Sequence, residues 1–336
     1  MSISRSGILA GGNWIIDHVK IVDVYPEQDA LANILEESSS NGGSPYNILI
    51  DLARLGAKFP LEGVGLLGRD SYGEIILKNC KHHKISTKQL QMQEGIPTSY
   101  TDVMTVKSTG RRTFFHQRGA NALLNPSHFV FSKTKAKIFH LGYLLLLDSL
   151  DAPSKSHGTK AGEVLAKAQR AGLKTSVDVV SEDSRRFTSI VLPTLKYVDF
   201  LILNEFEAER ITGVPLRKKS KLITNNLKKA AQKLLKAGVR EWVVIHYPEG
   251  SLALGHGECL SQGNVSFPRS KIAGTAGAGD AFAAGLLFSL HENIPMAEGL
   301  RYASCVAAAS LAHPTCSLGV QSLEKCIKLG KKYGYR

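Results

Sequence analysis

From about residue 137 onward, short apolar runs alternate with segments whose apolar residues recur every three or four positions. A short apolar run between turn residues is typical of a buried strand, whereas the longer spacing is typical of an amphipathic helix. The pattern predicts strands at residues 136–141, 175–180, 198–203 and 242–245, and helices at 160–171, from 205 onward and at 222–237. Strands and helices in alternation imply a mainly parallel sheet covered on both faces, so we expect an α/β fold with a three-layer α/β/α arrangement.

The first 120 residues follow a different pattern. Residues 14–24 and 99–115 alternate apolar and polar side chains, and Ser108, Thr109 and Gly110 mark a turn in the second segment. Such alternation is typical of half-exposed antiparallel strands, so we expect a small β-sheet lid with strands within about residues 14–24 and 97–120. Residues 36–43 (EESSSNGG) are interpreted as a short polar turn before a helix. The end of the chain predicts helices at 280–290, 296–312 and 322–332.

The length and composition indicate a globular enzyme-sized chain. Its 336 residues contain no internal repeat or low-complexity linker, and we expect one domain over 1–336, although at ~100–200 residues per domain this length would also permit two. The longest apolar stretch, residues 281–290, falls far short of the ~18 residues that a membrane-spanning helix requires. The five cysteines are an odd number with no C-x-x-C pair, as expected of reduced thiols. These observations predict a cytoplasmic protein that binds no membrane.

The formal charge of +13 raises the question of nucleic-acid binding. The basic runs, however, lie at residues 217–221, 228–229 and 325–332, in or beside predicted helices. No recognition motif or series of interleaved aromatic residues accompanies them. We therefore interpret them as solvated helix faces and expect no nucleic-acid partner, while a positive field also suits an enzyme with phosphorylated ligands.

The strongest chemical signal is the segment KIAGTAGAGDAFAAGLLFSL, residues 271–290. Gly274, Gly277 and Gly279 lead directly into an apolar helix with Asp280 in its first turn. Backbone N–H groups freed by glycine and the positive end of a helix dipole together form an anion hole. An aspartate held there can accept the proton of an attacking hydroxyl, although an acidic helix cap after a flexible turn would have the same local sequence.

The run Gly277-Ala278-Gly279-Asp280 followed by Ala-Phe strongly resembles the C-terminal signature of the ribokinase-like (PfkB) family of carbohydrate and nucleoside kinases. Four further segments match the family in the same order, at residues 12–17, 41–47, 63–73 and 203–207. The resemblance extends from about residue 8 to about residue 330. It implies a ribokinase-like fold and an ATP-dependent phosphotransferase in which Asp280 is the general base and Gly277, Ala278 and Gly279 form the anion hole.

The same resemblance implies where the acceptor binds. Asp17 matches the family's early aspartate for substrate hydroxyls, and Gly42, Gly43 and Asn47 match its G-G-x-x-x-N substrate loop. A carboxylate accepts hydrogen bonds from two neighbouring hydroxyls, and glycine lets a ligand approach the backbone closely. The alternatives are an ordinary lid residue for Asp17, a plain turn for the glycines and a helix start for Asn47.

The donor side is implied in the same way. Asn204 and Glu207 match the family's N-x-x-E motif, which organises Mg²⁺ and phosphates, so Glu207 would hold Mg²⁺ through water. Both residues also fit as caps of the helix that follows. The nucleotide-binding residues implied by the resemblance are Asn204, Gly250, Thr275, Gly277 and Gly279. The G-x-G-x-x-G spelled by residues 63–68 lies within an apolar strand and therefore does not indicate a dinucleotide fold.

The sequence departs from the family at three places. Gly274 stands where an aspartate usually helps to hold a monovalent cation, so a potassium requirement is in doubt. Residues 245–250 (IHYPEG) keep only the final glycine of a T-x-G-x-x-G segment near the nucleotide. Gly142 stands where ribokinases carry a glutamate that touches ribose, which argues against ribose as the specific substrate.

Several substrate classes stay open at this point. The acceptor is expected to be a small sugar or sugar acid phosphorylated on a primary hydroxyl. G-G-S-P-Y-N from Gly42 is similar to fructokinases, whereas Gly119-Ala120-Asn121 resembles ribokinases. A nucleoside kinase is an alternative in which Trp14 and Tyr46 stack on a base, and a non-catalytic ligand-binding member is another. Family lids often dimerise, so a homodimer through the lid is a candidate assembly.

Overall fold

The computed structural model of the chain describes residues 5–336. Its centre is a nine-stranded sheet with the order β17-β16-β15-β12-β11-β8-β1-β4-β5. The strands from β15 to β5 in this order pair in parallel, and β16 and β17 continue the sheet in antiparallel orientation. The strand bounds are β1 Ile8–Gly12, β4 Leu61–Gly68, β5 Ser86–Gln93, β8 Ile138–Leu144, β11 Lys174–Val179, β12 Phe200–Asn204, β15 Trp242–Tyr247, β16 Gly250–Gly255 and β17 Glu258–Gly263.

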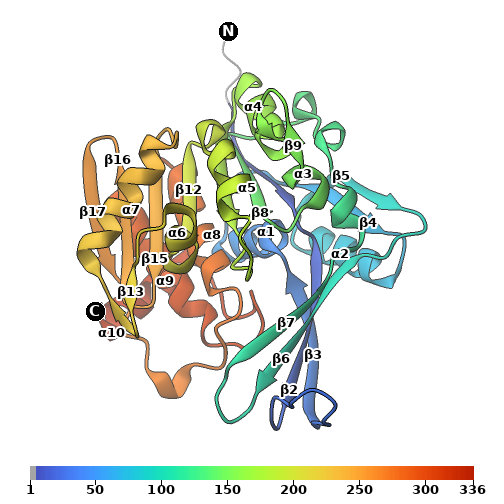
Figure 1. Cartoon of the computed structure of the whole chain (residues 1–336), viewed down its shortest axis with the longest axis vertical. Helices are drawn as coiled ribbons and strands as arrows, with labels where there is room; N and C mark the ends of the chain where they lie inside the picture. The colour runs from blue at the N-terminus through green and yellow to red at the C-terminus, as the bar shows by residue number, and fades with distance from the viewer. Residues whose placement is uncertain (1–4) are drawn as a thin grey trace.

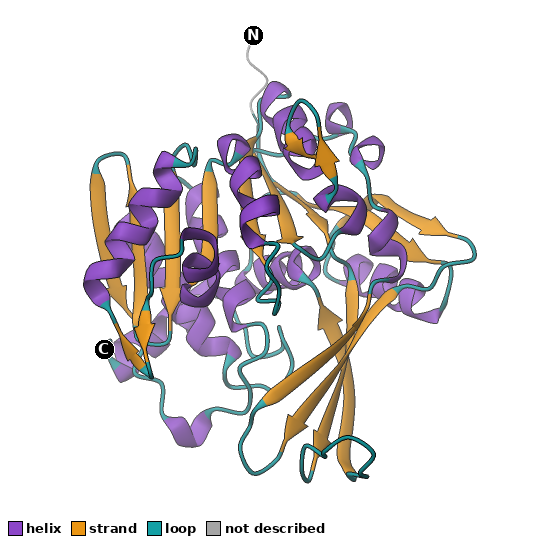
Figure 2. Cartoon of the chain, in the orientation of Figure 1, coloured by secondary structure: helices purple, strands orange, loops and turns teal. Residues whose placement is uncertain are grey.

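Helices cover both faces of this sheet (Figures 1 and 2). Alternate side chains of the strands point to opposite faces, which is why Ile8 and Ala10 belong to one hydrophobic core and Leu9 to the other. One face carries α4 Lys160–Arg170, α5 Phe187–Thr194, α6 Glu205–Thr212 and α7 Thr224–Lys236. The other carries α1 Ser44–Leu55, α2 Ser71–His82, α8 Ala278–His291 and α9 Met296–Ser310, with α10 Leu323–Tyr333 packed on α9. The predicted three-layer α/β architecture is therefore confirmed.

A separate four-stranded sheet, called the lid below, projects from the body (Figure 1). Its order is β3-β2-β6-β7, formed by β3 Ile34–Gly42, β2 Ile15–Val22, β6 Ser99–Val106 and β7 Arg112–Gln117. The interpretation of residues 36–43 as a turn is wrong, because β3 pairs with β2 along almost its whole length. Residues 34–39 are all exposed, so the strand buries neither face and lacks the alternation by which strands are recognised.

The short remaining elements connect the larger ones. They are the α3 turn at Asp148–Asp151 and the two-residue strands β9 Pro153–Ser154, β10 Gly158–Thr159, β13 Arg217–Lys218 and β14 Lys221–Leu222. Gly63, Gly65 and Gly68 lie in β4 and open no helix, as the sequence predicted. A Cβ atom on Gly65 would lie 2.4 Å from the Trp14 ring, so this glycine makes room for a buried indole. Within residues 5–336, no helix is both long and apolar enough to cross a membrane.

Candidate active site

A cleft of about 830 Å³ lies between the lid and the carboxyl ends of the central parallel strands. The body contributes residues at the ends of β8, β11, β12 and β15, together with the glycine-containing segment that precedes α8. The lid contributes residues of β2, β6 and β7. Ligands of open α/β sheets bind at this edge, because the strand ends and helix N-termini meet there. The cleft brings most of the predicted site residues together: Asp17, Gly43, Asn47, Asn204, Glu207, Thr275, Gly277, Ala278, Gly279 and Asp280.

Asp280 lies in the first turn of α8 at the floor of this cleft. Its carboxyl group is buried, and two donors reach it. Asn47 Nδ2 donates to Oδ2 over 2.7 Å, and the Tyr143 hydroxyl lies 2.8 Å from each oxygen. The pKa of Asp280 is raised from its ordinary value to about 7, chiefly by burial and also by the nearby Asp178 carboxylate, while both hydrogen bonds act to lower it. A carboxyl group with a pKa near neutrality is well suited to exchange protons with a bound hydroxyl.

The segment before Asp280 adopts the conformation that its glycines allow. Gly277 has a φ of 71° and begins α8, and a Cβ atom there would lie 2.7 Å from the Cys316 backbone. Gly279 has ordinary φ, and a Cβ atom there would meet only the His246 ring, at 3.5 Å. The first N–H groups of α8 have no acceptor within the helix and stand at its positive end. The segment can therefore bind an anionic group beside Asp280.

Asp17 faces Asp280 from lid strand β2. Its carboxyl group accepts a hydrogen bond from the Cys316 thiol at 3.6 Å, and burial raises its pKa to about 7. Gly42 lies beside it on β3, where a Cβ atom would be 2.4 Å from the Asp17 carboxyl carbon. Gly43 follows with a φ of 83° and a Cβ position 2.1 Å from the Asn13 carbonyl oxygen. The two glycines thus allow the lid and α1 to meet around Asp17.

Asn47 connects the lid to Asp280. It lies buried in the first half of α1, and its Oδ1 accepts a hydrogen bond of 2.6 Å from Asn41 on β3 while its Nδ2 donates to Asp280. Asn41 also donates to Ser317 Oγ over 2.9 Å. Arg112 makes a second connection, because its guanidinium donates to Thr275 Oγ1 over 2.7 Å. Lid strands β3 and β7 therefore contact the catalytic side of the body.

Asn204 and Glu207 form a complete capping box at the start of α6. Asn204 Oδ1 accepts from the Glu207 N–H, and Glu207 Oε2 accepts from the Asn204 N–H, both over 2.9 Å. Glu207 Oε1 accepts from Ser181 Oγ over 2.6 Å and from Asn204 Nδ2 over 2.7 Å. Burial raises the pKa of Glu207 to about 8. Asn204 and Glu207 therefore do cap α6, as the alternative interpretation of these residues expected.

The same geometry decides how Glu207 fits Mg²⁺. Both carboxylate oxygens already accept hydrogen bonds from the protein, which leaves little capacity for a direct metal bond. Mg²⁺ keeps several of its waters when it binds, and the cleft face of this carboxylate can accept from such waters. Among residues 5–336, no group of three or more His, Cys, Asp and Glu side chains could hold a metal ion directly. Glu207 could therefore contact Mg²⁺ only through water.

Gly250 does not line the cleft. It begins β16, and a Cβ atom there would lie 2.4 Å from the Gln262 carbonyl oxygen of the neighbouring strand, so packing within the sheet explains this glycine. Of the altered segment at residues 245–250, only His246 reaches the cleft. Burial lowers the pKa of His246 to about 4, so its ring is neutral near pH 7.

The nucleoside alternative loses its structural basis in Trp14 and Tyr46. Both side chains are fully buried and pack against each other with ring centroids 5.4 Å apart. The Trp14 ring nitrogen donates to the Val64 carbonyl oxygen, and the Tyr46 hydroxyl accepts from Asn79. Neither lines the cleft, so the idea that they stack on a base is wrong.

The cleft residues that the sequence analysis did not find include Asp178, Tyr143 and Arg112. Asp178 is the penultimate residue of β11, a strand that was predicted, and its position at the carboxyl edge was the available signal. Its Oδ1 is buried without a hydrogen-bond partner, 2.0 Å from where a Cβ atom on Gly142 would stand, so no larger residue fits at 142. Tyr143 and Arg112 had no sequence signal, because their roles depend on how β8 and β7 lie relative to α8.

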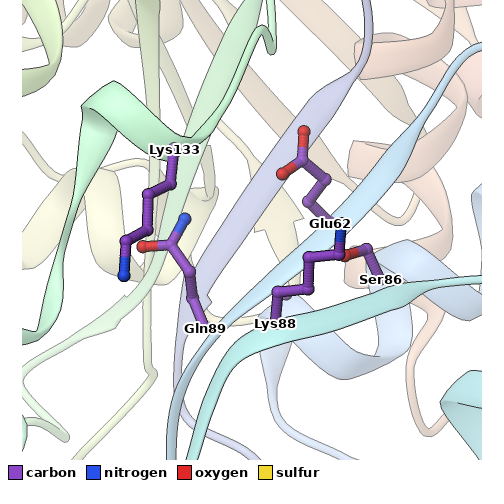
Figure 3. Close-up of a pocket in the computed structure, with 6 residues that line it drawn as sticks. Glu62, Ser86, Lys88, Gln89 and Lys133 are labelled. Carbon is purple, nitrogen blue, oxygen red and sulfur yellow. The ribbon is translucent and has the colours of Figure 1, made fainter.

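A smaller cavity of about 280 Å³ lies at the β4–β5 edge of the large sheet (Figure 3). It contains none of the predicted site residues and is lined by Glu62, Gly63, Ser86, Lys88, Gln89 and Lys133. The larger cleft, with its buried carboxyl groups and helix N-terminus, is therefore the candidate active site.

The fold and the cleft together define a class of protein: a small-molecule kinase with an α/β body and a β-sheet lid. The chain belongs to the pfkB family of carbohydrate kinases, whose family model matches residues 10–323. Mouse ribokinase is 25% identical over 91% of this chain and 89% of its own length. The Giardia lamblia ribokinase structure covers 98% of this chain and all of its own at 23% identity, with a TM-score of 0.80. An Arabidopsis thaliana ribokinase complexed with ribose and ATP covers 97% of this chain and 98% of its own at 22% identity, with a TM-score of 0.75.

Proposed function

We propose that this kinase transfers the γ-phosphoryl group of ATP to a primary hydroxyl of a small sugar or sugar acid, with Asp280 as the general base. One observation carries the proposal. The buried carboxyl group of Asp280 stands at the N-terminus of α8 and shares one cleft with Asp17 and Asn47. A proton acceptor, an anion-binding helix end and a site for hydroxyl groups are the parts that this reaction needs.

In this proposal, residues on one side of the cleft bind the acceptor and residues on the other side bind the nucleotide. Asp17, Gly43 and Asn47 orient the acceptor, and Asp280 takes the proton from its hydroxyl. The N–H groups at Gly277, Ala278 and Gly279 stabilise negative charge on the transferring group. The nucleotide contacts Asn204, Thr275, Gly277 and Gly279. Glu207 would hold Mg²⁺ through water, and the bound ion would supply charge neutralisation at the phosphates.

We propose that residues 1–336 act as one kinase domain in which the lid excludes water from the reaction. The contacts of Asn41 with Ser317 and of Arg112 with Thr275 support this role, because they connect the lid to the segments around the glycines. Water that reached the transferring phosphoryl group would compete with the acceptor.

The pH dependence follows from the two carboxyl groups that must be ionised. Asp280 and Asp17 each have a pKa raised to about 7. Asp280 accepts a proton only when ionised, and Asp17 accepts hydroxyl hydrogen bonds best in that form. We therefore expect kcat/KM to fall steeply as the pH decreases through 7, with a limiting slope above one on a logarithmic plot. A flat profile between pH 5 and 8 would contradict these roles.

We further propose that the protein forms a homodimer through the lid. Large apolar side chains are exposed on the lid strands and their connections: Val24, Tyr25, Leu31, Ile34, Leu35, Phe114 and Phe115. Exposed apolar side chains gathered on one feature mark interaction surfaces. Sedimentation velocity at micromolar concentration should give twice the 36.4 kDa chain mass, and Leu31→Lys with Phe115→Lys should return the monomer. A monomeric wild type would refute the proposal.

The function is tested by measuring ADP release with Mg-ATP across sugars, sugar acids and nucleosides. The same assays with and without potassium test whether the enzyme requires a monovalent cation. A Cβ atom on Gly274 would lie 2.8 Å from Pro314 Cα, so this position has no room for a carboxylate, and we expect no potassium dependence. Turnover confined to nucleosides would establish the nucleoside kinase instead. Binding of ATP without turnover on any acceptor would favour a non-catalytic member.

A further inference from the structure

The Tyr143 hydroxyl occupies a position that the mechanism leaves unexplained. It lies 2.8 Å from both carboxylate oxygens of Asp280 and is the one side-chain hydroxyl within residues 5–336 that hydrogen-bonds to this carboxyl group. Asn47 Nδ2 also donates to Asp280 Oδ2, over 2.7 Å. The ring comes from β8, where the Tyr143 N–H donates to Asn13 Oδ1 over 2.6 Å. The backbone of Tyr143 is therefore fixed, and only rotation of its side chain can move the hydroxyl.

This geometry is the one that a general base requires of its substrate. A hydroxyl about to lose its proton must donate to the base over about 2.6–3.2 Å. Tyr143 meets this condition in the protein without an acceptor. Asp280 is only 6% exposed, so little of the carboxyl group is left for another hydroxyl or for water while the phenol is in place.

We propose that Tyr143 is a positioning residue that covers Asp280 until the acceptor arrives, and that the acceptor hydroxyl then displaces the phenol from the base. The inference rests on the proposed function, since it assigns Asp280 as the base. While Tyr143 covers Asp280, the base cannot activate water. The enzyme therefore spends little ATP on hydrolysis in the absence of an acceptor.

The acidic groups around Asp280 explain why the group that covers it, the Tyr143 phenol, stays uncharged. The titratable groups near it come from five elements: Asp17 of β2, Asp51 of α1, Asp178 of β11, Tyr143 of β8 and Cys316 of the segment before α10. Negative charge on Asp178 and Asp17 raises the pKa of Asp280, whereas the Tyr143 hydrogen bond lowers it. Burial and the nearby carboxylates of Asp280 and Asp178 raise the pKa of Tyr143, so the phenol keeps its proton and stays a donor.

Tyr143→Phe tests the proposal, because it removes one oxygen and keeps the ring. Without the cover, ATP hydrolysis in the absence of acceptor should rise at least fivefold. The acceptor no longer has a hydrogen bond to displace, so its KM should fall about fivefold, as expected for one ordinary hydrogen bond, with a smaller change in kcat. Tyr302→Phe is the matched control, since Tyr302 donates to Glu298 on the surface.

Two pH measurements separate displacement from a purely structural role. Loss of the hydrogen bond should raise the pKa of Asp280, so the acid limb of kcat/KM should move to higher pH in Tyr143→Phe. The acid limbs of kcat should coincide, because a bound acceptor has removed the phenol in the wild type as well. If the acid limbs of the wild type and Tyr143→Phe coincided for kcat/KM as well as for kcat, the proposal would be refuted.

Other outcomes would also overturn the inference. A KM that rises in Tyr143→Phe would mean that the phenol contacts the acceptor directly. Unchanged ATP hydrolysis would mean that the hydroxyl covers nothing, and phosphotyrosine at position 143 by mass spectrometry would make it an acceptor. A wild type that phosphorylates no acceptor refutes the proposed function instead. Carboxyl NMR titration of Asp280 in the acceptor-free protein would then still decide whether Tyr143 donates to it.

Discussion

Asp280→Asn should lower kcat about a thousandfold, with ATP and acceptor binding retained. A positioned general base contributes about 10²–10⁴ to the rate, and Asp280 combines that role with a place beside the glycine segment. Asn has nearly the same shape, and it keeps one oxygen for the Tyr143 hydroxyl. Because burial raises the pKa of Asp280, ionisation of this group opposes folding at neutral pH. The thermal midpoint of the variant should therefore not fall.

The matched control is Asp29→Asn. Asp29 is exposed between β2 and β3, and its φ of 67° suits Asn as well as Asp. Steady-state kinetics at saturating ATP and acceptor, with calorimetric unfolding of both variants, gives the comparison. A fall in kcat of less than tenfold in a folded Asp280→Asn enzyme would mean that another group accepts the proton.

Gly277→Ala should lower kcat about a hundredfold and destabilise the fold. Its φ of 71° costs an L-residue about 1–2 kcal/mol. The added Cβ would also lie 2.7 Å from Cys316 Cα, Cβ and O, so the segment must move. A displaced N–H donor in such an anion site typically costs about 10²–10³ in rate.

Substitutions at two other glycines distinguish the effect of backbone strain from the effect of a steric clash. Gly95 has a φ of 74° with no atom within 4 Å of its Cβ position, so Gly95→Ala should reproduce the backbone strain and leave kcat unchanged. Gly279 has ordinary φ, and its Cβ position meets only His246, so Gly279→Ala should fold normally. If Gly277→Ala turned over like Gly95→Ala, the position of this segment would not matter for catalysis.

The clustering of carboxyl groups in the cleft is unexpected for a chain with a formal charge of +13. Asp17, Asp178, Glu207 and Asp280 all line it. Burial is the first cause of the raised pKa values of Asp17, Glu207 and Asp280, and mutual repulsion adds to the shifts of the last two. Arg112 and the N-terminus of α8 offset this negative field on the donor side.

The elements that the sequence predicted are those whose buried apolar side chains form a recognisable pattern along the chain. The strands of the large sheet and helix α8 bury apolar side chains, and the apolar runs at residues 175–180 and 281–290 follow from that burial. The glycines before Asp280 were informative because a φ of 71° at Gly277 favours glycine strongly. Local physics of this kind is visible in a single sequence.

The parts that were missed depend on contacts between distant segments. Strand β3 is held by backbone pairing with β2, and its exposed side chains carry no periodic signal. Tyr143 is 137 residues from Asp280 in sequence, and its hydroxyl reaches the Asp280 carboxyl group only because β8 ends beside α8. Gly250 was assigned to the nucleotide on resemblance, whereas the strand pairing of β16 and β17 already explains its lack of a side chain.

The most direct test of the central claim is ³¹P NMR of the products formed from Mg-ATP and the acceptor panel. We predict that the wild type converts ATP to ADP with a new phosphate-monoester resonance, coupled to the protons of a primary carbon, from one sugar or sugar acid. Asp280→Asn should leave the ATP signals intact over the same period. Inorganic phosphate alone, or an equal yield of monoester from Asp280→Asn, would contradict the account.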